Sequence, residues 1–315
     1  MQDSVLSLTN VDKNYGKFKA VDDVSISIPK GSIYGFLGPN GAGKTTTLRM
    51  ILEIIKPSSG EISVLGHSSA LDVRNRIGYL PEEKGLYKKM KVWAIIQYFA
   101  MLKGMEKQAA KDRAWELLEK YGLKDFAESK VEALSKGMGQ KVQVLSAVAH
   151  NPELVILDEP FSGLDPVNQT VLEDLINDLS DNGQTVIFST HVMQHAERLC
   201  DHILLIAKGR KIFDGTIGEA KATIPRRVIL ETNDNIETLK NIDGVNGIDP
   251  FEVEDGELSA KQWQVQIAEQ VNPQAILKTC FEQNISLNRF KFTEPTLHDV
   301  FVHLVGDDAK EAEFR

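Results

Sequence analysis

Gly38-Pro39-Asn40-Gly41-Ala42-Gly43-Lys44-Thr45 is the stretch of sequence that decides the fold. It matches the pattern G-x-x-x-x-G-K-[ST], in which backbone amides surround the phosphates of a nucleotide. Glycines let the backbone approach an anion closely, because a side chain there would collide with it. We expect Lys44 to contact the β- and γ-phosphates and Thr45 to ligate Mg²⁺, with Thr46 completing the nucleotide-binding set.

The residues on either side of this loop have the pattern that a phosphate loop needs. Ile33–Leu37 is a short apolar run typical of a buried strand, and residues 46–52 are typical of a helix. Strand, loop and helix in this order direct the positive end of the helix dipole toward the anion. The alternative, a glycine-rich turn before an ordinary helix, does not require this order.

A second pattern, Leu-Val-Ile-Leu-Asp-Glu-Pro, occupies Leu154–Pro160. A continuous apolar run is typical of a strand buried on both faces of a parallel sheet, and such strands end in ligand crevices. Asp158 would hold the Mg²⁺ shell, and Glu159 would polarise a water for attack on the γ-phosphate. By itself the pair could equally be an acidic turn after a core strand, but the phosphate loop upstream favours a nucleotide site.

Three shorter motifs follow in a fixed order. Leu134–Lys141 presents Ser135 and Gly137 ahead of a helical stretch, Ser162–Asp165 reads Ser-Gly-Leu-Asp, and a β-rich run brings His191 to a strand end. Each motif alone is weak, because a single histidine after a strand is more often structural than catalytic. Their order and spacing carry the information.

Together these motifs resemble the ATPase subunits of ABC transporters, over roughly residues 4–220. In that family the phosphate loop is followed by a glutamine loop, a Leu-Ser-Gly-Gly signature, the acidic strand, a Ser-Gly-Leu-Asp loop and a switch histidine. The resemblance implies that two nucleotide-binding subunits, most simply two copies of this chain, dimerise head to tail around two ATP molecules. Each ATP would touch Lys44 and Thr45 of one subunit and Ser135 and Gly137 of the other.

The resemblance also implies roles for other residues and a partner. His191 would contact the γ-phosphate and orient Glu159, and Tyr15 matches the aromatic residue that stacks on adenine. The alternative for Tyr15 is an aromatic ring at the edge of a small sheet. The work of hydrolysis would drive export through a membrane-spanning permease on a separate chain. The run around Tyr79–Tyr87 resembles bacterial single-cassette export ATPases of the sodium-exporter-like branch.

Two positions depart from the family pattern. Lys136 stands where the signature usually has glycine, and it either adds positive charge near the phosphate of the partner site or points to solvent. Glu82 stands where the family has glutamine. A carboxylate ligates Mg²⁺ as an amide oxygen does, but it adds negative charge beside the phosphates. We expect Glu82 to be a metal ligand, and our hypothesis is that it couples the site to the membrane partner.

Composition and charge limit the remaining function classes. The chain has 315 residues, a formal net charge of −9 and only two cysteines, Cys200 and Cys280. The acidic balance argues against broad binding to nucleic acid, and the cysteine count argues against a disulfide framework or a zinc site. The N-terminus lacks the pattern of a signal peptide, and no apolar run reaches the ~18 residues of a membrane span. We therefore expect a cytoplasmic protein, peripheral on the inner face of the cell membrane.

The predicted fold class is α/β: an ABC-type P-loop NTPase with an antiparallel β subdomain, a helical subdomain and a small C-terminal α+β domain. We expect the ATP-binding domain at residues 1–220, with its helical subdomain at about 83–150, and the second domain at 221–315. In the second domain Pro225–Arg227 is typical of a linker. Strands are expected at 228–230, 262–267 and 285–292, and helices at 275–281 and 297–304. A ferredoxin-like arrangement fits this order, with a regulatory, dimer-supporting or purely structural role.

Two other function classes compete with the export motor. A soluble ABC ATPase acting on ribosomes or nucleic acid would usually carry two cassettes, long coiled coils or zinc cysteines, which this sequence lacks. A nucleotide-gated regulator without useful hydrolysis would not need Glu159 and His191. The sequence therefore predicts an ATP-hydrolysing subunit.

Overall fold

The computed structural model describes residues 4–83, 85–250, 261–268 and 270–306. Within these residues the chain divides into two compact units, one extending to Ile217 and the other running from Gly218 to Gly306. Residues 307–315, the predicted end of the second domain, lie outside the described residues. No helix among the described residues is both long and apolar enough to cross a membrane.

The first unit contains two sheets. The smaller is antiparallel, in the order β2-β1-β4. The larger has the order β5-β6-β7-β3-β8-β9, in which the first five strands run parallel and β9 pairs antiparallel with β8. The strands are β1 (Ser4–Tyr15), β2 (Phe18–Pro29), β3 (Ile33–Leu37), β4 (Ser59–Val64), β5 (Ile77–Leu80), β6 (Leu154–Asp158), β7 (Thr185–Thr190), β8 (His202–Ala207) and β9 (Arg210–Thr216).

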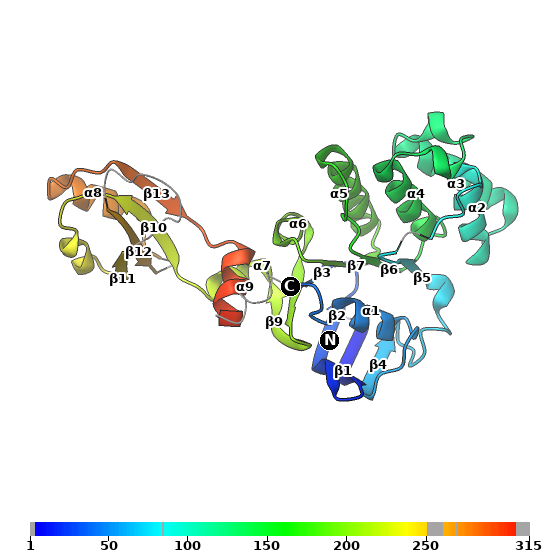
Figure 1. The fold of residues 1–315 in the computed structure, drawn as a ribbon, viewed down its shortest axis with the longest axis horizontal. Helices are drawn as coiled ribbons and strands as arrows, with labels where there is room; N and C mark the ends of the chain where they lie inside the picture. Colours follow the sequence, from blue (N-terminus) through cyan, green and yellow to red (C-terminus); the bar gives the residue numbers. More distant parts are fainter. Residues whose placement is uncertain (1–3, 84, 251–260, 269, 307–315) are drawn as a thin grey trace. The chain divides into compact units, whose positions relative to one another are not determined.

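Helices cover both faces of the larger sheet. Figure 1 shows α2 to α5 on one side, and α1 with the antiparallel sheet on the other. The helices of this unit are α1 (Lys44–Ile51), α2 (Val92–Leu102), α3 (Lys107–Lys120), α4 (Lys136–Val148), α5 (Pro166–Asp181) and α6 (Met193–Leu199), with short 3₁₀ helices η1 (Arg74–Arg76), η2 (Lys124–Phe126) and η3 (Val131–Ala133). The helix α7 (Ile217–Ala222) follows β9.

Strand β6 shows why the sheet is covered on both faces. All five of its residues are buried. Leu154 and Ile156 belong to the core under α1 and the antiparallel sheet, whereas Val155 and Leu157 belong to the core under α2 to α5. Because successive side chains of a strand point to opposite faces, a continuous apolar run requires apolar cover on both. Strand β6 therefore carries its polar residues only at its carboxyl end.

The second unit has a four-stranded antiparallel sheet in the order β11-β12-β10-β13. With a helical segment after the first strand and another after the third, this is the ferredoxin-like arrangement expected from the sequence. Its buried core is apolar and separate from the cores of the first unit. Its elements are β10 (Arg226–Glu231), η4 (Glu237–Asn241), β11 (Val245–Pro250), β12 (Gln262–Ile267), α8 (Pro273–Glu282), β13 (Arg289–Thr293) and α9 (Leu297–Val305).

Two expectations for this unit were wrong in detail, and one strand was not predicted. Arg226 and Arg227 are not a linker but the first residues of β10, opposite Ile267 and Gln266. The guanidinium of Arg226 lies 4.6 Å from the centre of the Phe292 ring, and Arg227 pairs with a carboxylate on α9. These partners are distant in sequence. Two adjacent arginines therefore did not suggest a strand when the sequence was considered alone. The last strand begins at Arg289 rather than at 285, and β11 had no expected counterpart.

Candidate active site

The phosphate loop connects β3 to α1, as predicted. Gly38 has φ of +152° and Gly43 has φ of +107°, values in the left-handed region that side chains disfavour. A Cβ at Gly38 would lie 2.1 Å from the carbonyl oxygen of Ile206, and one at Gly43 would lie 2.6 Å from that of Ala20. The loop is therefore pressed against neighbouring backbone, and only glycine fits at these two positions. No side chain among the described residues caps the first turn of α1, which leaves its amides free for an anion.

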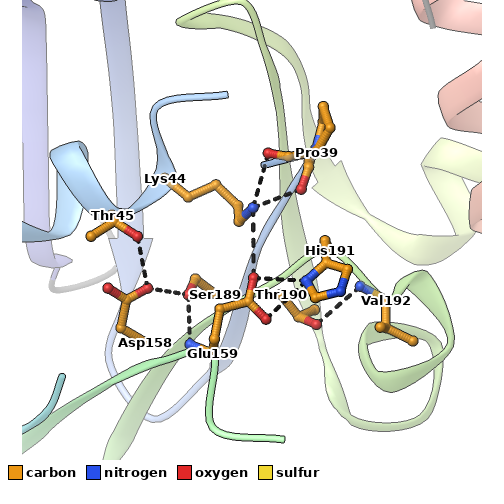
Figure 2. A network of polar contacts seen from close by, with 10 residues as sticks. Pro39, Lys44, Thr45, Asp158, Glu159, Ser189, Thr190, His191 and Val192 are labelled. Atoms are coloured by element: carbon orange, nitrogen blue, oxygen red, sulfur yellow. Dashed lines mark hydrogen bonds and ion pairs between the residues drawn. The ribbon is translucent and has the colours of Figure 1, made fainter. Parts of the chain in front are cut away.

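Lys44 is buried at the centre of this loop. Its Nζ donates hydrogen bonds to the carbonyl oxygens of Gly38 at 2.7 Å and Pro39 at 3.1 Å, and lies 3.7 Å from Oε1 of Glu159 (Figure 2). Burial lowers the pKa of Lys44, whereas the nearby carboxylates of Glu159, Asp158 and Glu82 oppose that change. The lysine thus places a positive charge where the loop would hold phosphates.

Asp158 ends β6 beside Thr45. The Thr45 hydroxyl donates to Oδ1 of Asp158 at 3.1 Å, and the Ser189 hydroxyl donates to the same oxygen at 2.5 Å. Asp158 is 1% exposed, and its Oδ2 is buried with no hydrogen-bond partner among the described residues. A buried anionic oxygen without a partner is costly unless a cation or its water fills the place. Thr45 and Asp158 therefore fit a hydrated Mg²⁺.

Glu159 and His191 lie in contact, as Figure 2 shows. Nδ1 of His191 is 3.1 Å from both carboxylate oxygens of Glu159. The Glu159 side chain is 10% exposed and that of His191 is 48% exposed, so the carboxylate sits at the inner end of an open site. Glu159 has φ of +47°, a left-handed conformation that is uncommon for a side-chain-bearing residue and concentrates at functional sites.

Sequence reasoning missed Ser189, which joins the two acidic residues. Strand β7 places it opposite Asp158 in the parallel register. Its Oγ donates to Asp158 and also accepts the backbone N–H of Glu159 at 2.9 Å, so that one hydroxyl holds the strained turn and the carboxylate before it. The only sequence signal was a small polar residue near the end of an apolar strand, two positions before the histidine.

Tyr15 and Glu82 line a hollow of about 330 Å³ together with the phosphate loop and Glu159. Tyr15 is 52% exposed, and Nζ of Lys13 lies 5.1 Å from its ring centre. An exposed ring at the rim of a phosphate site has the position that stacking on a base requires. Among the described residues, the lining of this hollow is Tyr15, Phe18, Ala20, Asn40, Gly41, Ala42, Gly43, Lys44, Thr45, Thr46, Glu82 and Glu159.

Ser135 and Gly137 do not line that hollow. Ser135 is the N-cap of α4, and its side chain accepts the backbone N–H of Met138 at 3.3 Å. A Cβ at Gly137 would lie 2.6 Å from the side chain of Asn168 on α5. The serine and the glycine amides of this turn are thus presented apart from the phosphate loop of the same chain, as the head-to-tail arrangement expected from the sequence requires.

Lys136 is exposed and lies against the Ser-Gly-Leu-Asp loop. Its Nζ would be 2.0 Å from a Cβ at Gly163, so the lysine covers the bare side of that glycine. A few residues further along α4, the Gln140 side chain donates to the carbonyl oxygen of Pro160 at 3.1 Å. The signature turn and the loop after Glu159 therefore form one packed unit.

These features define a P-loop nucleotide-hydrolysing protein, and comparison with known proteins gives the family. The ABC transporter family model matches residues 21–162. The model of the C-terminal domain of DrrA1-3-like ATP-binding proteins matches residues 215–305.

Relatives match nearly the whole chain. An uncharacterised ABC transporter ATP-binding protein, YhaQ of Bacillus subtilis, is 41% identical over 96% of this chain and 99% of its own length. The bacitracin transport ATP-binding protein BcrA of Bacillus licheniformis is 32% identical over 96% of this chain and 98% of its own.

Solved structures match about 70% of the chain. An ATP-binding subunit of an ABC transporter has a TM-score of 0.65 and 30% identity, covering 70% of this chain and 93% of that one. A dimeric ATP-binding cassette in a post-hydrolysis state, bound to ADP and Pi, has a TM-score of 0.62 and 26% identity, covering 67% and 98%.

The chain belongs to the ABC transporter family of ATP-binding proteins and is an ATPase of that family. This confirms the family and the fold class predicted from the sequence. The competing class, a soluble ATPase acting on ribosomes or nucleic acid, finds no support among these relatives.

Proposed function

We propose that this protein is the ATP-hydrolysing subunit of an exporter and powers a membrane-spanning permease on a separate chain through ATP-driven dimerisation. The observation that carries this proposal is the cluster of Lys44, Glu159 and His191, with Nζ and Nδ1 lying 3.7 and 3.1 Å from the same carboxylate. Relatives such as the bacitracin transport protein are named for transport, and one structural neighbour is dimeric. The roles of the residues and the assembly proposed below are based on this cluster and on these relatives.

In this proposal Glu159 accepts a proton from the water that attacks the γ-phosphate of ATP. His191 holds the carboxylate and contacts the γ-phosphate, while Lys44 neutralises charge on the β- and γ-phosphates. Phosphoryl transfer depends mainly on positioning and electrostatics, so three correctly placed groups supply most of what the reaction needs. Tyr15 stacks on adenine, and the loop from Gly38 to Thr46 holds the phosphates.

Mg²⁺ is part of the proposal. Thr45 and Asp158 would hold it, because the orphaned Oδ2 of Asp158 requires a cation or its water. Glu82 lines the same hollow and would add a carboxylate oxygen. When bound, Mg²⁺ neutralises charge on the phosphates.

The partner interactions follow from the signature turn. Ser135 and Gly137 would contact the ATP held by the second subunit, most simply another copy of this chain. Hydrolysis removes the charge that joins the two subunits, and the dimer then opens. We infer a protein that is peripheral on the cytoplasmic face of the membrane and held there by its permease. We place the domain boundary near residue 220, with the second domain supporting or regulating the dimer.

Two experiments test the proposal. Glu159→Gln should bind ATP, lose nearly all turnover and accumulate as an ATP-bound dimer in size-exclusion chromatography. The matched control Glu119→Gln, which removes an exposed carboxylate paired with Lys124, should turn over ATP at the wild-type rate. Purification of the tagged protein in mild detergent should recover a multi-spanning membrane protein. Normal turnover by Glu159→Gln would remove Glu159 as the base, and recovery of ribosomes without a permease would contradict the motor role.

A further inference from the structure

The ring of Phe161, two residues after Glu159, is held between two other rings. It stacks on His195 with ring centres 4.2 Å apart and an interplanar angle of 9°, and meets Phe188 edge-on at 5.8 Å. Phe161 is 5% exposed and His195 is 7% exposed. Aromatic rings packed in this way stabilise one another beyond the area that they bury. The His195 ring therefore helps to hold the Phe161 side chain, and with it the backbone just after Glu159.

His195 belongs to the short helix α6, which begins two residues after His191. The segment 191–199 thus touches the catalytic turn twice, with His191 on the carboxylate of Glu159 and His195 on Phe161. A shift of α6 along its axis would move both contacts together.

Helix α5 secures the other side of α6. Nδ1 of His195 lies 3.8 Å from Oε1 of Glu173, and the guanidinium of Arg198 lies 3.3 Å from the same oxygen. Burial lowers the pKa of His195, while Glu173 raises it and Arg198 and His191 lower it. The Arg198 pair therefore supplies the charge contact to α5, and the ring of His195 contributes chiefly by stacking.

A hollow lies beside this contact. It has a volume of about 240 Å³ and is bounded by Glu159, His191 and His195 and by the loop that follows Phe161. Truncation of the His195 ring would enlarge that hollow next to the strained Glu159 turn, whose φ is +47°. Strained backbone persists only where its surroundings over-determine it, so a loss of packing here would release the turn.

We infer that His195 is a positioning residue for ATP hydrolysis, which acts through Phe161 to hold Glu159 and His191 in register. The inference rests on the proposed role of Glu159 as the base. It assigns to an aromatic ring, rather than to a titrating imidazole, the task of keeping the carboxylate aimed at the attacking water. Misplacement by about 1 Å is enough to cost up to a hundredfold in rate.

The test compares variants of the full chain at position 195. His195→Ala should lower kcat about tenfold with KM for ATP changed less than twofold, because Tyr15 and the phosphate loop are untouched. His195→Phe should recover kcat to within about threefold and keep the pH profile of the wild type, since it restores the stacked ring. His202→Ala is the matched control, since His202 also stacks on an aromatic ring, that of Tyr34, but away from Glu159. The His202→Ala variant should keep kcat within twofold of the wild-type value.

If His195→Ala does not fold, His195→Leu and His195→Phe carry the comparison, because leucine keeps bulk without a ring. A kcat for His195→Ala or His195→Leu within twofold of the wild type would overturn the inference. So would a His195→Phe variant as slow as the variants without a ring. Full activity in Glu159→Gln would instead remove the proposed base, whereas an inactive Glu159→Gln beside an active His195→Ala would overturn only the positioning role.

Discussion

Replacement of Ser189 by alanine should damage both stability and turnover. The hydroxyl donates to the buried carboxylate of Asp158 at 2.5 Å and accepts the amide of Glu159 at 2.9 Å. A hydrogen bond to a charged group is worth about 1.5–3 kcal/mol and a neutral one about 0.5–1.5 kcal/mol. The two together predict a loss of about 2–4.5 kcal/mol in the free energy of unfolding.

The same change should lower kcat about 5- to 45-fold. Each 1.36 kcal/mol of lost transition-state stabilisation is a factor of ten, and this range corresponds to half of the lost energy, about 1–2.2 kcal/mol, serving to hold Glu159. The assays are urea unfolding followed by the fluorescence of Trp93 and Trp115, and phosphate release at saturating ATP. Ser146→Ala is the matched control, because Ser146 is a buried serine whose hydroxyl donates to the helix carbonyl of Val142, away from the acidic residues.

Ser146→Ala should cost at most about 1 kcal/mol and leave kcat unchanged. If Ser189→Ala unfolds at the same urea concentration as the wild type and keeps its kcat within twofold, the reasoning about this hydroxyl is refuted.

Three further predictions concern single residues. Tyr15→Ala should raise KM for ATP by about 5- to 160-fold at nearly constant kcat, because stacking on a base contributes about 1–3 kcal/mol. An unchanged KM would mean that the ring only occupies the edge of the sheet. His150→Gln should flatten the loss of stability between pH 6.5 and about 4. Burial lowers the pKa of His150 to about 4, so the unfolded chain binds the extra proton first and the wild type loses stability as pH falls through this window. At about 1.4 kcal/mol per pKa unit, the difference between 6.5 and about 4 is at most about 3.5 kcal/mol, and the partial exposure of the ring reduces it. Acid titration of urea midpoints measures the effect, and equal slopes in both proteins would contradict it. Lys136→Ala in the Glu159→Gln background should weaken ATP-driven dimerisation about 3- to 10-fold, more strongly at low salt, if the cation faces the partner's phosphate; a salt-independent result would assign it only to packing on Gly163.

The sequence was sufficient for the fold of the first unit because its signals are local. A phosphate loop needs glycines at fixed spacing, so Gly38–Thr45 can be recognised from the sequence. A parallel strand covered on both faces needs an unbroken apolar run, so Leu154–Asp158 can be recognised in the same way. In the second unit the start of β10 could not be predicted from the sequence, because the partners of Arg226 and Arg227 lie on β13 and α9, far away in the chain.

What only the tertiary structure decided is which side chains come into contact. The parallel register of β6 and β7 sets Ser189 opposite Asp158, and the packing of α6 on the Glu159 turn sets His195 on Phe161. Neither Ser189 nor His195 belongs to a recognisable sequence motif, because a serine in a strand and a histidine in a helix are common in proteins. The sequence alone determined the chemistry of this protein, because nucleotide binding requires particular residues at particular spacings. The tertiary structure determined how that chemistry is held in place, because the contacts that do so join segments about 30 residues apart in the chain.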